Sequence, residues 1–284
     1  MPTVASLHVY PLKGAAGFSP ESWPVEERGL RHDRRFMLVD DSGKFISQRG
    51  CRQLALVRAT IGDATLRISC PLGDVAIPLP VSGSAARTRI PVTVWDDTFE
   101  SVPVSPDADA LLSDFLAQSC RLVWMPDDAD RFTPEHRAAP RRRVSLADAA
   151  PVLLVTEAAL ADLNERLETN GDASVPLNRF RANIVVRGAD VGDDDEWTSI
   201  TIGAAQLRVP NACGRCQVIT IDQSTAEPRG PEPLRTLATY RREGDQITFG
   251  QHVLVDTAGT IGVGDDVEIT ARQRPREARS RSAP

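Results

Sequence analysis

The sequence lacks any apolar run of the roughly 18 to 20 residues that a membrane-spanning helix needs. Residues 1–6 also lack the basic and apolar segments of a secretory signal peptide. Histidine and cysteine are scarce, with 4 histidines and 5 cysteines in 284 residues. An odd number of scattered cysteines is not typical of a secreted disulfide framework. We therefore expect a cytoplasmic protein that has reduced thiols and no membrane partner.

A surplus of positive charge is also missing, because the formal net charge is -6. Affinity for nucleic acid requires a basic surface, so the composition argues against a nucleic-acid partner. Arginine is nevertheless locally dense at Arg34 and Arg35, at residues 141–143, at Arg179 and Arg181, and in the tail after residue 271. These arginines could build a local anion site. The alternative is that they simply pair with some of the 39 acidic side chains at the surface.

Short β-forming segments separated by glycine and proline dominate the first hundred residues. We expect strands at residues 4–10, 35–39, 45–47, 54–61, 65–69, 74–77 and 88–95. Ser105 and Pro106 then supply an N-cap and a first-turn proline for one amphipathic helix. Residues 1–124 are therefore expected to form a β-rich N-terminal domain.

The second part of the chain begins after a segment, residues 125–143, that is rich in Pro, Asp and Arg and predicts a surface connection. A buried strand at residues 152–155 and a helix at residues 156–167, capped by Thr156, are expected next. Further strands are expected at residues 183–187, 200–202, 206–209, 217–221, 252–255 and 267–270. Strands outnumber helices, so we expect a mainly β fold with a few flanking helices (α+β), a barrel or curled sheet over residues 125–271, and a disordered basic tail over residues 272–284.

Cys213 and Cys216 form a CxxC pair in the segment Asn211–Asp222 (NACGRCQVITID). A structural zinc site needs four ligands, and the sequence has neither a second CxxC nor paired histidines. A thioredoxin-like dithiol would precede a helix, whereas residues 217–221 favour a strand. One thiolate can also be a soft ligand to a redox metal that a cofactor largely holds. The spacing alone leaves these roles, and that of a buried structural pair, open.

Further segments accompany the CxxC pair in a fixed order. They are Tyr10–Gly14 (YPLKG), Gly29–Val39 (GLRHDRRFMLV), Asn178–Val186 (NRFRANIVV), Pro233–Arg241 (PLRTLATYR) and Phe249–Gly264 (FGQHVLVDTAGTIGVG). The ordered set resembles the MOSC superfamily, in particular its two-part members such as the mitochondrial amidoxime-reducing component and its bacterial relatives. The resemblance covers nearly the whole chain apart from its tail. It implies a β-barrel MOSC domain plus a β-rich N-terminal MOSC subdomain.

This resemblance also implies a cofactor site. In the family the second cysteine of the pair coordinates molybdenum, so Cys216 is the expected metal ligand and catalytic residue, and Cys213 is expected to be structural. The molybdenum cofactor (Mo-molybdopterin) is then expected to contact Lys13, Arg35, Asp148, Arg181, Asn183, Gly214, Arg215, Cys216 and His252. Cationic and amide side chains suit an anionic pterin with a phosphate tail. A capping or turn role for Asn183 and a structural role for His252 are the alternatives. Pyridoxal phosphate is not expected.

The function that the resemblance implies is a molybdenum-dependent oxidoreductase that reduces N-hydroxylated compounds such as amidoximes, hydroxylamines and N-hydroxylated bases. No cysteine follows Cys216, so we expect a separate electron donor of the ferredoxin, flavodoxin or flavin reductase type. The first β segment begins almost at residue 1, which favours a free, bacterial-type enzyme. The alternative is a MOSC sulfur carrier, or a cofactor-binding and delivery protein without reductase activity.

Overall fold

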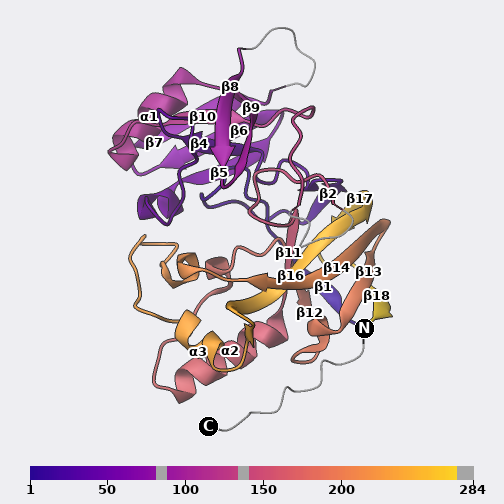
Figure 1. Cartoon of the computed structure of the whole chain (residues 1–284). Helices are drawn as coiled ribbons and strands as arrows, with labels where there is room; N and C mark the ends of the chain where they lie inside the picture. Colours follow the sequence, from indigo (N-terminus) through magenta and orange to yellow (C-terminus); the bar gives the residue numbers. More distant parts are fainter. Residues whose placement is uncertain (81–87, 134–140, 274–284) are drawn as a thin grey trace.

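A computed structural model describes residues 1–80, 88–133 and 141–273, and these form two lobes (Figure 1). The residues outside these ranges include part of the predicted connection and most of the predicted tail. Strands predominate over helices, which confirms the expected mainly β fold of the α+β type. None of the helices in the described ranges is long and apolar enough to cross a membrane.

The N-terminal lobe contains two antiparallel sheets, one with the order β4-β10-β9-β8 and one with the order β5-β6-β7. Its elements are β4 (Phe36–Val39), η1 (Arg52–Leu56), β5 (Arg58–Gly62), β6 (Thr65–Cys70), β7 (Gly73–Pro78), β8 (Ile90–Val94), β9 (Asp97–Pro103), α1 (Pro106–Leu116) and β10 (Arg121–Trp124). The helix begins as predicted, because the Ser105 side chain accepts a hydrogen bond from the backbone N–H of Ala108. Leu112 and Leu116 on its inner face pack into the core of this lobe.

The C-terminal lobe is built around an eight-stranded sheet with the order β1-β12-β11-β16-β14-β13-β18, to which β15 adds at β16. Its strands are β1 (Thr3–Leu7), β11 (Val152–Thr156), β12 (Ile184–Arg187), β13 (Trp197–Ile202), β14 (Ala205–Gly214), β15 (Arg242–Glu243), β16 (Gln246–Thr257) and β18 (Val267–Arg272). A second sheet, β17-β2-β3, contains β2 (Ser22–Glu26), β3 (Gly29–Leu30) and β17 (Gly259–Gly262). The helical segments are α2 (Glu157–Thr169), α3 (Leu234–Ala238), η2 (Leu177–Arg179), η3 (Asp193–Asp195) and η4 (Gln217–Thr220).

The strands of the first thirty residues contribute to the core of the C-terminal lobe, whereas Leu12, between β1 and β2, packs into the core of the N-terminal lobe. β1 pairs with β12 and β2 pairs with β17, so the indigo strands lie among the late ones in Figure 1. Val4, Leu7 and Val25 are buried in the same cluster as Trp197. The chain therefore contacts the N-terminal lobe between β1 and β2, enters it after β3 and returns to the C-terminal lobe after β10. The domain boundary expected between residues 124 and 125 stays a prediction. Side chains from before this boundary pack into the core of the C-terminal lobe.

Three expected strands are wrong in part or entirely. Residues 45–47 form no strand, although Phe45 makes one isolated bridge to Val39. The first half of the expected strand 54–61 is the 3-10 helix η1. Residues 217–221 contain the 3-10 helix η4, in which the N–H of Ile219 bonds the carbonyl of Cys216 at 3.2 Å. The β-branched residues of this segment favour a strand, but the chain turns immediately after β14 ends.

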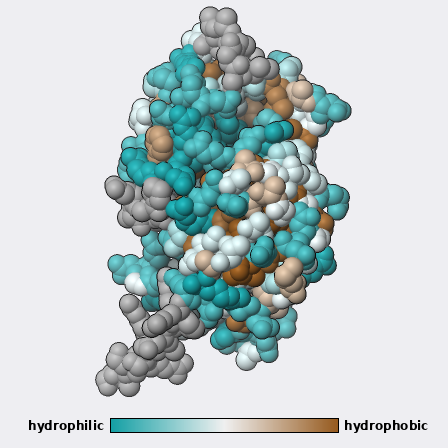
Figure 2. Space-filling view, turned by 90° about the vertical axis from the view of Figure 1, so that its right-hand side faces the viewer, coloured by the Kyte–Doolittle hydropathy of each residue, from teal (hydrophilic) through white to brown (hydrophobic). Residues whose placement is uncertain are grey.

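The described surface exposes few large apolar side chains. Met1, Leu72 and Val191 are exposed at chain ends or turns, and Trp95 is 42% exposed. Figure 2 shows a face on which hydrophilic residues prevail and hydrophobic ones form smaller groups. Trp95 differs from the others because it also lines a cavity.

Candidate functional site

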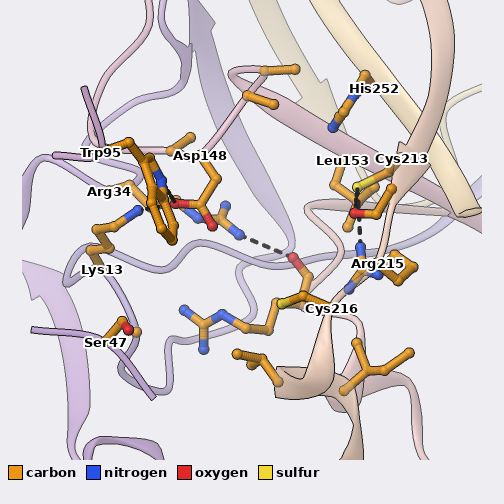
Figure 3. Close-up of a pocket in the computed structure, with 18 of the residues that line it drawn as sticks. Lys13, Arg34, Ser47, Trp95, Asp148, Leu153, Cys213, Arg215, Cys216 and His252 are labelled. Atoms are coloured by element: carbon orange, nitrogen blue, oxygen red, sulfur yellow. Dashed lines mark hydrogen bonds and ion pairs between the residues drawn. The ribbon is translucent and has the colours of Figure 1, made fainter. Parts of the chain in front are cut away.

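A cavity of about 1000 Å³ is lined by residues from both lobes. The N-terminal lobe contributes Phe45 and the tip of the β8–β9 hairpin at Trp95. The C-terminal lobe contributes the end of β14, with Cys213 and Cys216 near it, and His252 of β16 (Figure 3). The cavity therefore brings together segments that are far apart in the sequence.

Positive charge predominates on the cavity wall, although the chain as a whole is acidic. The cationic lining residues are Lys13, Arg34, Arg49, Arg131, Arg141, Arg179, Arg181 and Arg215, and the carboxylates are Asp96, Asp97, Asp148 and Asp245. Because eight cations face four carboxylates, the wall suits an anionic ligand.

Lys13 and Asp148 form an ion pair on this wall. The Lys13 ammonium also donates to the carbonyl oxygen of Leu146 at 2.7 Å. Burial lowers the pKa of Lys13, and Asp148 opposes that effect. Partial removal from water opposes the ionisation of Asp148, but the Lys13 ammonium outweighs this and holds the pKa of Asp148 well below its usual range. Both charges therefore persist at neutral pH.

The side chains of the neighbouring residues Arg34 and Arg35 differ in direction, because only that of Arg34 lines the cavity. Arg34 lies in the left-handed backbone region, with φ of 47°, and its side chain lines the cavity. Its guanidinium pairs with Asp33 and donates to the Asn183 amide oxygen at 2.9 Å. Arg35, the expected cofactor contact, does not line the cavity, because its guanidinium donates to the carbonyl of Met125 at 2.6 Å and pairs with an aspartate beyond it. The cavity arginine is thus displaced by one residue from the predicted position.

Arg181, a predicted cofactor contact, lines the cavity. One of its terminal nitrogens donates to the carbonyl of Ala15 at 2.7 Å, and its guanidinium lies 4.4 Å from the centre of the Tyr10 ring. Burial, aided by the neighbouring Arg34 charge, lowers the pKa of Arg181 to about 10. The side chain remains cationic at neutral pH.

Asn183 also lines the cavity, but its amide is fully engaged within the protein. The nitrogen donates to the carbonyl of His8 and to Asp33, each at 3.1 Å. The oxygen accepts from Arg34 at 2.9 Å and from the backbone N–H of Leu153 at 3.1 Å. These four bonds use the hydrogen-bonding capacity of the amide, and they support a structural role that includes holding Arg34 in place.

Cys216 lies between the end of β14 and η4, and it lines the cavity as a half-buried side chain. The preceding Arg215 donates to the sulfur of Cys213 at 3.3 Å and to the carbonyl of Phe180 at 2.8 Å. At Gly214 an added Cβ would lie 2.5 Å from the side-chain oxygen of Gln246, so the backbone passes close to that side chain. The predicted residues 214–216 therefore all reach the cavity.

Cys213 shares the cavity wall with Cys216. Burial opposes its ionisation, but His252 and Arg215 outweigh this and lower the pKa of the Cys213 thiol to about 6. His252 is 5% exposed, and its Nδ1 lies 3.3 Å from the amide oxygen of Asn211. The structure thus gives Cys213 a polar, cationic environment that the sequence did not indicate.

The zinc and dithiol interpretations of the CxxC pair can be compared with this geometry. Among residues 1–80, 88–133 and 141–273, no three His, Cys, Asp or Glu side chains lie close enough to hold a metal ion together. The described residues therefore offer no four-ligand zinc site of the structural kind. The strand that argued against a thioredoxin-like dithiol is replaced by η4, but this helix has only four residues.

Several cavity residues were missed by the sequence analysis. Trp95 donates from its indole to Asp148 at 3.1 Å, and the guanidinium of Arg49 lies 4.4 Å from the Trp95 ring centre. Arg131 is 3% exposed and donates to the carbonyl of Ala147 at 2.5 Å, which fixes the loop that precedes Asp148. An aromatic residue beside two aspartates at a hairpin tip was the available signal for Trp95. No local pattern indicated Arg131.

Comparison with known proteins gives two family-model matches, "MOSC N-terminal beta barrel domain" at residues 1–119 and "MOSC domain" at residues 141–268. The chain is 34% identical to mitochondrial amidoxime-reducing component 1 of Mus musculus, over 94% of this chain and 82% of that protein. The human protein of the same name is 31% identical over the same shares. Molybdenum cofactor sulfurase of Danio rerio is 31% identical over 90% of this chain, which spans only 32% of the sulfurase.

Proposed function

The chain belongs to the MOSC family, and we propose that it is a molybdenum-cofactor-dependent oxidoreductase that reduces N-hydroxylated compounds. Its substrates are amidoximes, hydroxylamines or N-hydroxylated bases. A separate redox protein of the ferredoxin, flavodoxin or flavin reductase type delivers the electrons. The relatives named for amidoxime reduction support this choice of chemistry, because the chain covers most of their length.

One observation carries the proposal: a cationic cavity between the lobes holds Cys216 on its wall. A pterin cofactor is anionic through its phosphate, and its ring edge both donates and accepts hydrogen bonds. The eight cations of the lining match the charge of such a ligand, and Cys216 supplies the soft sulfur that molybdenum favours.

The residues present fit the cofactor by a second criterion. Three arginines of the lining each keep one buried nitrogen that has no hydrogen-bond partner among the described residues, namely Nε of Arg179, Nη2 of Arg181 and Nε of Arg215. Buried donors without an acceptor are costly, so such atoms are expected where a ligand supplies the acceptor. The donor set therefore suits an anion with several acceptor oxygens.

Each side chain has a role in this proposal. Lys13, Arg34 and Arg181 hold the phosphate and the pterin edge, and Asn183 keeps Arg34 in position. The Cys216 thiolate supplies the protein ligand to the metal. When bound, the molybdenum cofactor supplies the two-electron redox chemistry. The rings of Trp95 and Phe45 pack edge to face, with ring centres 4.8 Å apart. They restrict the access of water along the cavity wall that the N-terminal lobe contributes.

The proposal is tested by expressing the protein in a host that makes the cofactor and then measuring bound molybdenum and pterin. Reduction of benzamidoxime with a chemically reduced viologen dye is assayed in the same preparation. We expect stoichiometric molybdenum and turnover in the wild type, and loss of turnover in Cys216→Ser. Cys70 lies at the C-terminal end of β6 and does not line the cavity. Cys70→Ser is therefore the matched control and should behave like the wild type.

The alternative of a sulfur carrier or a cofactor-delivery protein makes a different prediction. It is favoured by the sulfurase match, which covers 90% of this chain. A protein that binds molybdenum and pterin fully but reduces neither amidoximes nor hydroxylamines would contradict the reductase proposal. That result would leave the cofactor site itself supported.

A further inference from the structure

Two neighbouring strands place a histidine between an amide and a thiol on the cavity wall. In the register of β14 and β16, Asn211 lies opposite His252. Nδ1 of His252 lies 3.3 Å from the amide oxygen of Asn211, and this oxygen can only accept, so Nδ1 carries a proton in this contact. The ring is 5% exposed, and the strand pairing and this bond fix its orientation.

The thiol partner is Cys213. Its sulfur accepts a hydrogen bond from Arg215 at 3.3 Å, and His252 lies on the same cavity wall. These two side chains are the charged groups that shift the ionisation of Cys213, and both favour the thiolate. With its pKa lowered to about 6, Cys213 is mainly ionised at neutral pH.

We propose that His252 and Cys213 form the proton-donating pair for the reduction, an inference that rests on the proposed function. Reduction of an N-hydroxylated compound breaks the N–O bond and consumes two electrons and two protons, and the oxygen leaves as water. Both electrons come from the redox partner protein. His252 transfers its proton to the departing hydroxyl, which leaves as water, and the pair takes up a second proton from solvent and transfers it to the nitrogen that remains. Cys213 keeps its oxidation state and serves as the counter-ion of the ring.

Other groups on the wall are less suited to this task. Lys13 and Asp148 are held to each other as an ion pair. Arg181 has a pKa of about 10 and holds its proton too tightly at neutral pH. An acid is most effective when its affinity for the proton is matched to the working pH, and Cys213, with a pKa of about 6, gives the pair such a member. His252 is also the one histidine among the described lining residues.

The pair can be tested without any turnover. Purified protein is alkylated with iodoacetamide between pH 5 and 9, and the modified cysteines are quantified by mass spectrometry. Trypsin cleaves after Arg208 and Arg215, so Cys213 and Cys216 fall on separate peptides. We expect the Cys213 alkylation rate to reach half its maximum near pH 6 in the wild type, and at a pH at least one unit higher in His252→Gln. Identical profiles in the two proteins would overturn the pair.

The catalytic role is tested by the pH dependence of kcat with benzamidoxime and a reduced viologen. His252→Gln should lower kcat by about 100-fold at unchanged molybdenum and pterin content, since a positioned acid contributes about 100- to 10,000-fold. Cys213→Ser should change the pH profile of kcat, because the pair loses its thiolate. Asn211→Ala should give a smaller loss of kcat, and Cys70→Ser should give none.

The two proposals fail in different ways. A wild type that binds molybdenum but reduces no N-hydroxylated compound overturns the proposed function, and the proton role falls with it. An active wild type with unchanged kcat and pH profile in His252→Gln overturns the proton role alone. Loss of molybdenum from His252→Gln, with normal turnover per bound metal, also overturns it, because His252 would then only support the cofactor.

Discussion

Lys13 and Asp148 form an ion pair although 135 residues separate them in the sequence. The same carboxylate oxygen of Asp148 accepts a hydrogen bond from the indole of Trp95 at 3.1 Å. Three segments therefore meet at one carboxylate: the YPLKG segment, the tip of the β8–β9 hairpin, and the loop before β11. This meeting point holds the two lobes together at the cavity.

The ion pair of Lys13 and Asp148 should contribute more to the free energy of unfolding than a fully exposed ion pair does. We expect Asp148→Asn to lower the free energy of unfolding by about 1–2 kcal/mol, less than a fully buried pair would cost, because Asp148 is 58% exposed. Asp74→Asn is the control, since it removes a pair with Arg67 in which both side chains are more than half exposed. Urea denaturation measures both. Equal losses in the two variants would contradict the structural importance of the Lys13 pair.

Consecutive arginines provide a second matched comparison. Arg34→Gln should remove a cation from the cavity and lower molybdenum and pterin occupancy several-fold. Arg35→Gln should leave occupancy unchanged, because that side chain is bound to Met125 and lies outside the cavity. Metal analysis and pterin fluorescence of the folded proteins measure the difference. Loss of cofactor in the Arg35 variant only would restore the role that the sequence predicted for it.

Asn183 should act mainly on stability. Asn183→Ala removes four hydrogen bonds from a residue that is 1% exposed, so we expect the free energy of unfolding to fall by about 2–4 kcal/mol. The exposed Asn170, which follows α2, provides Asn170→Ala as a control with little effect. A stable Asn183→Ala protein that fails to bind the cofactor would instead indicate a direct contact.

Asp222 should make stability depend on acidic pH. The hydroxyl and backbone N–H of Ser224, together with Arg229 and Arg179, lower the pKa of Asp222 from 3.8 to about 2. A depressed carboxyl pKa stabilises the fold above pH 4, and this contribution is lost as the pH falls from about 4 to 2.

The Asp222 prediction is tested with the melting temperature of Asp222→Asn. It should lie a few degrees below that of the wild type at pH 7, and the two should converge between pH 4 and 2. Thermal unfolding followed by circular dichroism gives both curves. A gap that stays constant down to pH 2 would contradict the assigned interactions of Asp222.

Local signals predicted much of the fold. The N-caps at Ser105 and Thr156 are confirmed, because each side chain accepts from the backbone three residues later. The wrong elements lie where tertiary contacts override composition. Residues 217–221 have the residue types of a strand, yet the chain must turn there, and only Ile219 in η4 is buried. The pairing of β1 with β12 joins distant segments and has no local signal.

Sequence analysis predicted only those residues of the candidate site that belong to short sequence motifs. Cys216, Lys13 and Arg181 were singled out from short segments, and all three line the cavity. The choice between Arg34 and Arg35 depends on the left-handed backbone at Arg34, which sequence alone does not specify. The Cys213 environment depends on a strand register that brings His252 alongside, so its ionisation could be inferred only from the structure.

The most direct test of the central claim is X-ray absorption at the molybdenum edge of the loaded protein. Cys216→Ser and Cys213→Ser are compared with the wild type after loading with the cofactor under the same conditions. We expect one fewer sulfur around the metal in the Cys216 variant and an unchanged sulfur shell in the Cys213 variant. An unchanged sulfur shell in Cys216→Ser would contradict the assignment of Cys216 as the metal ligand.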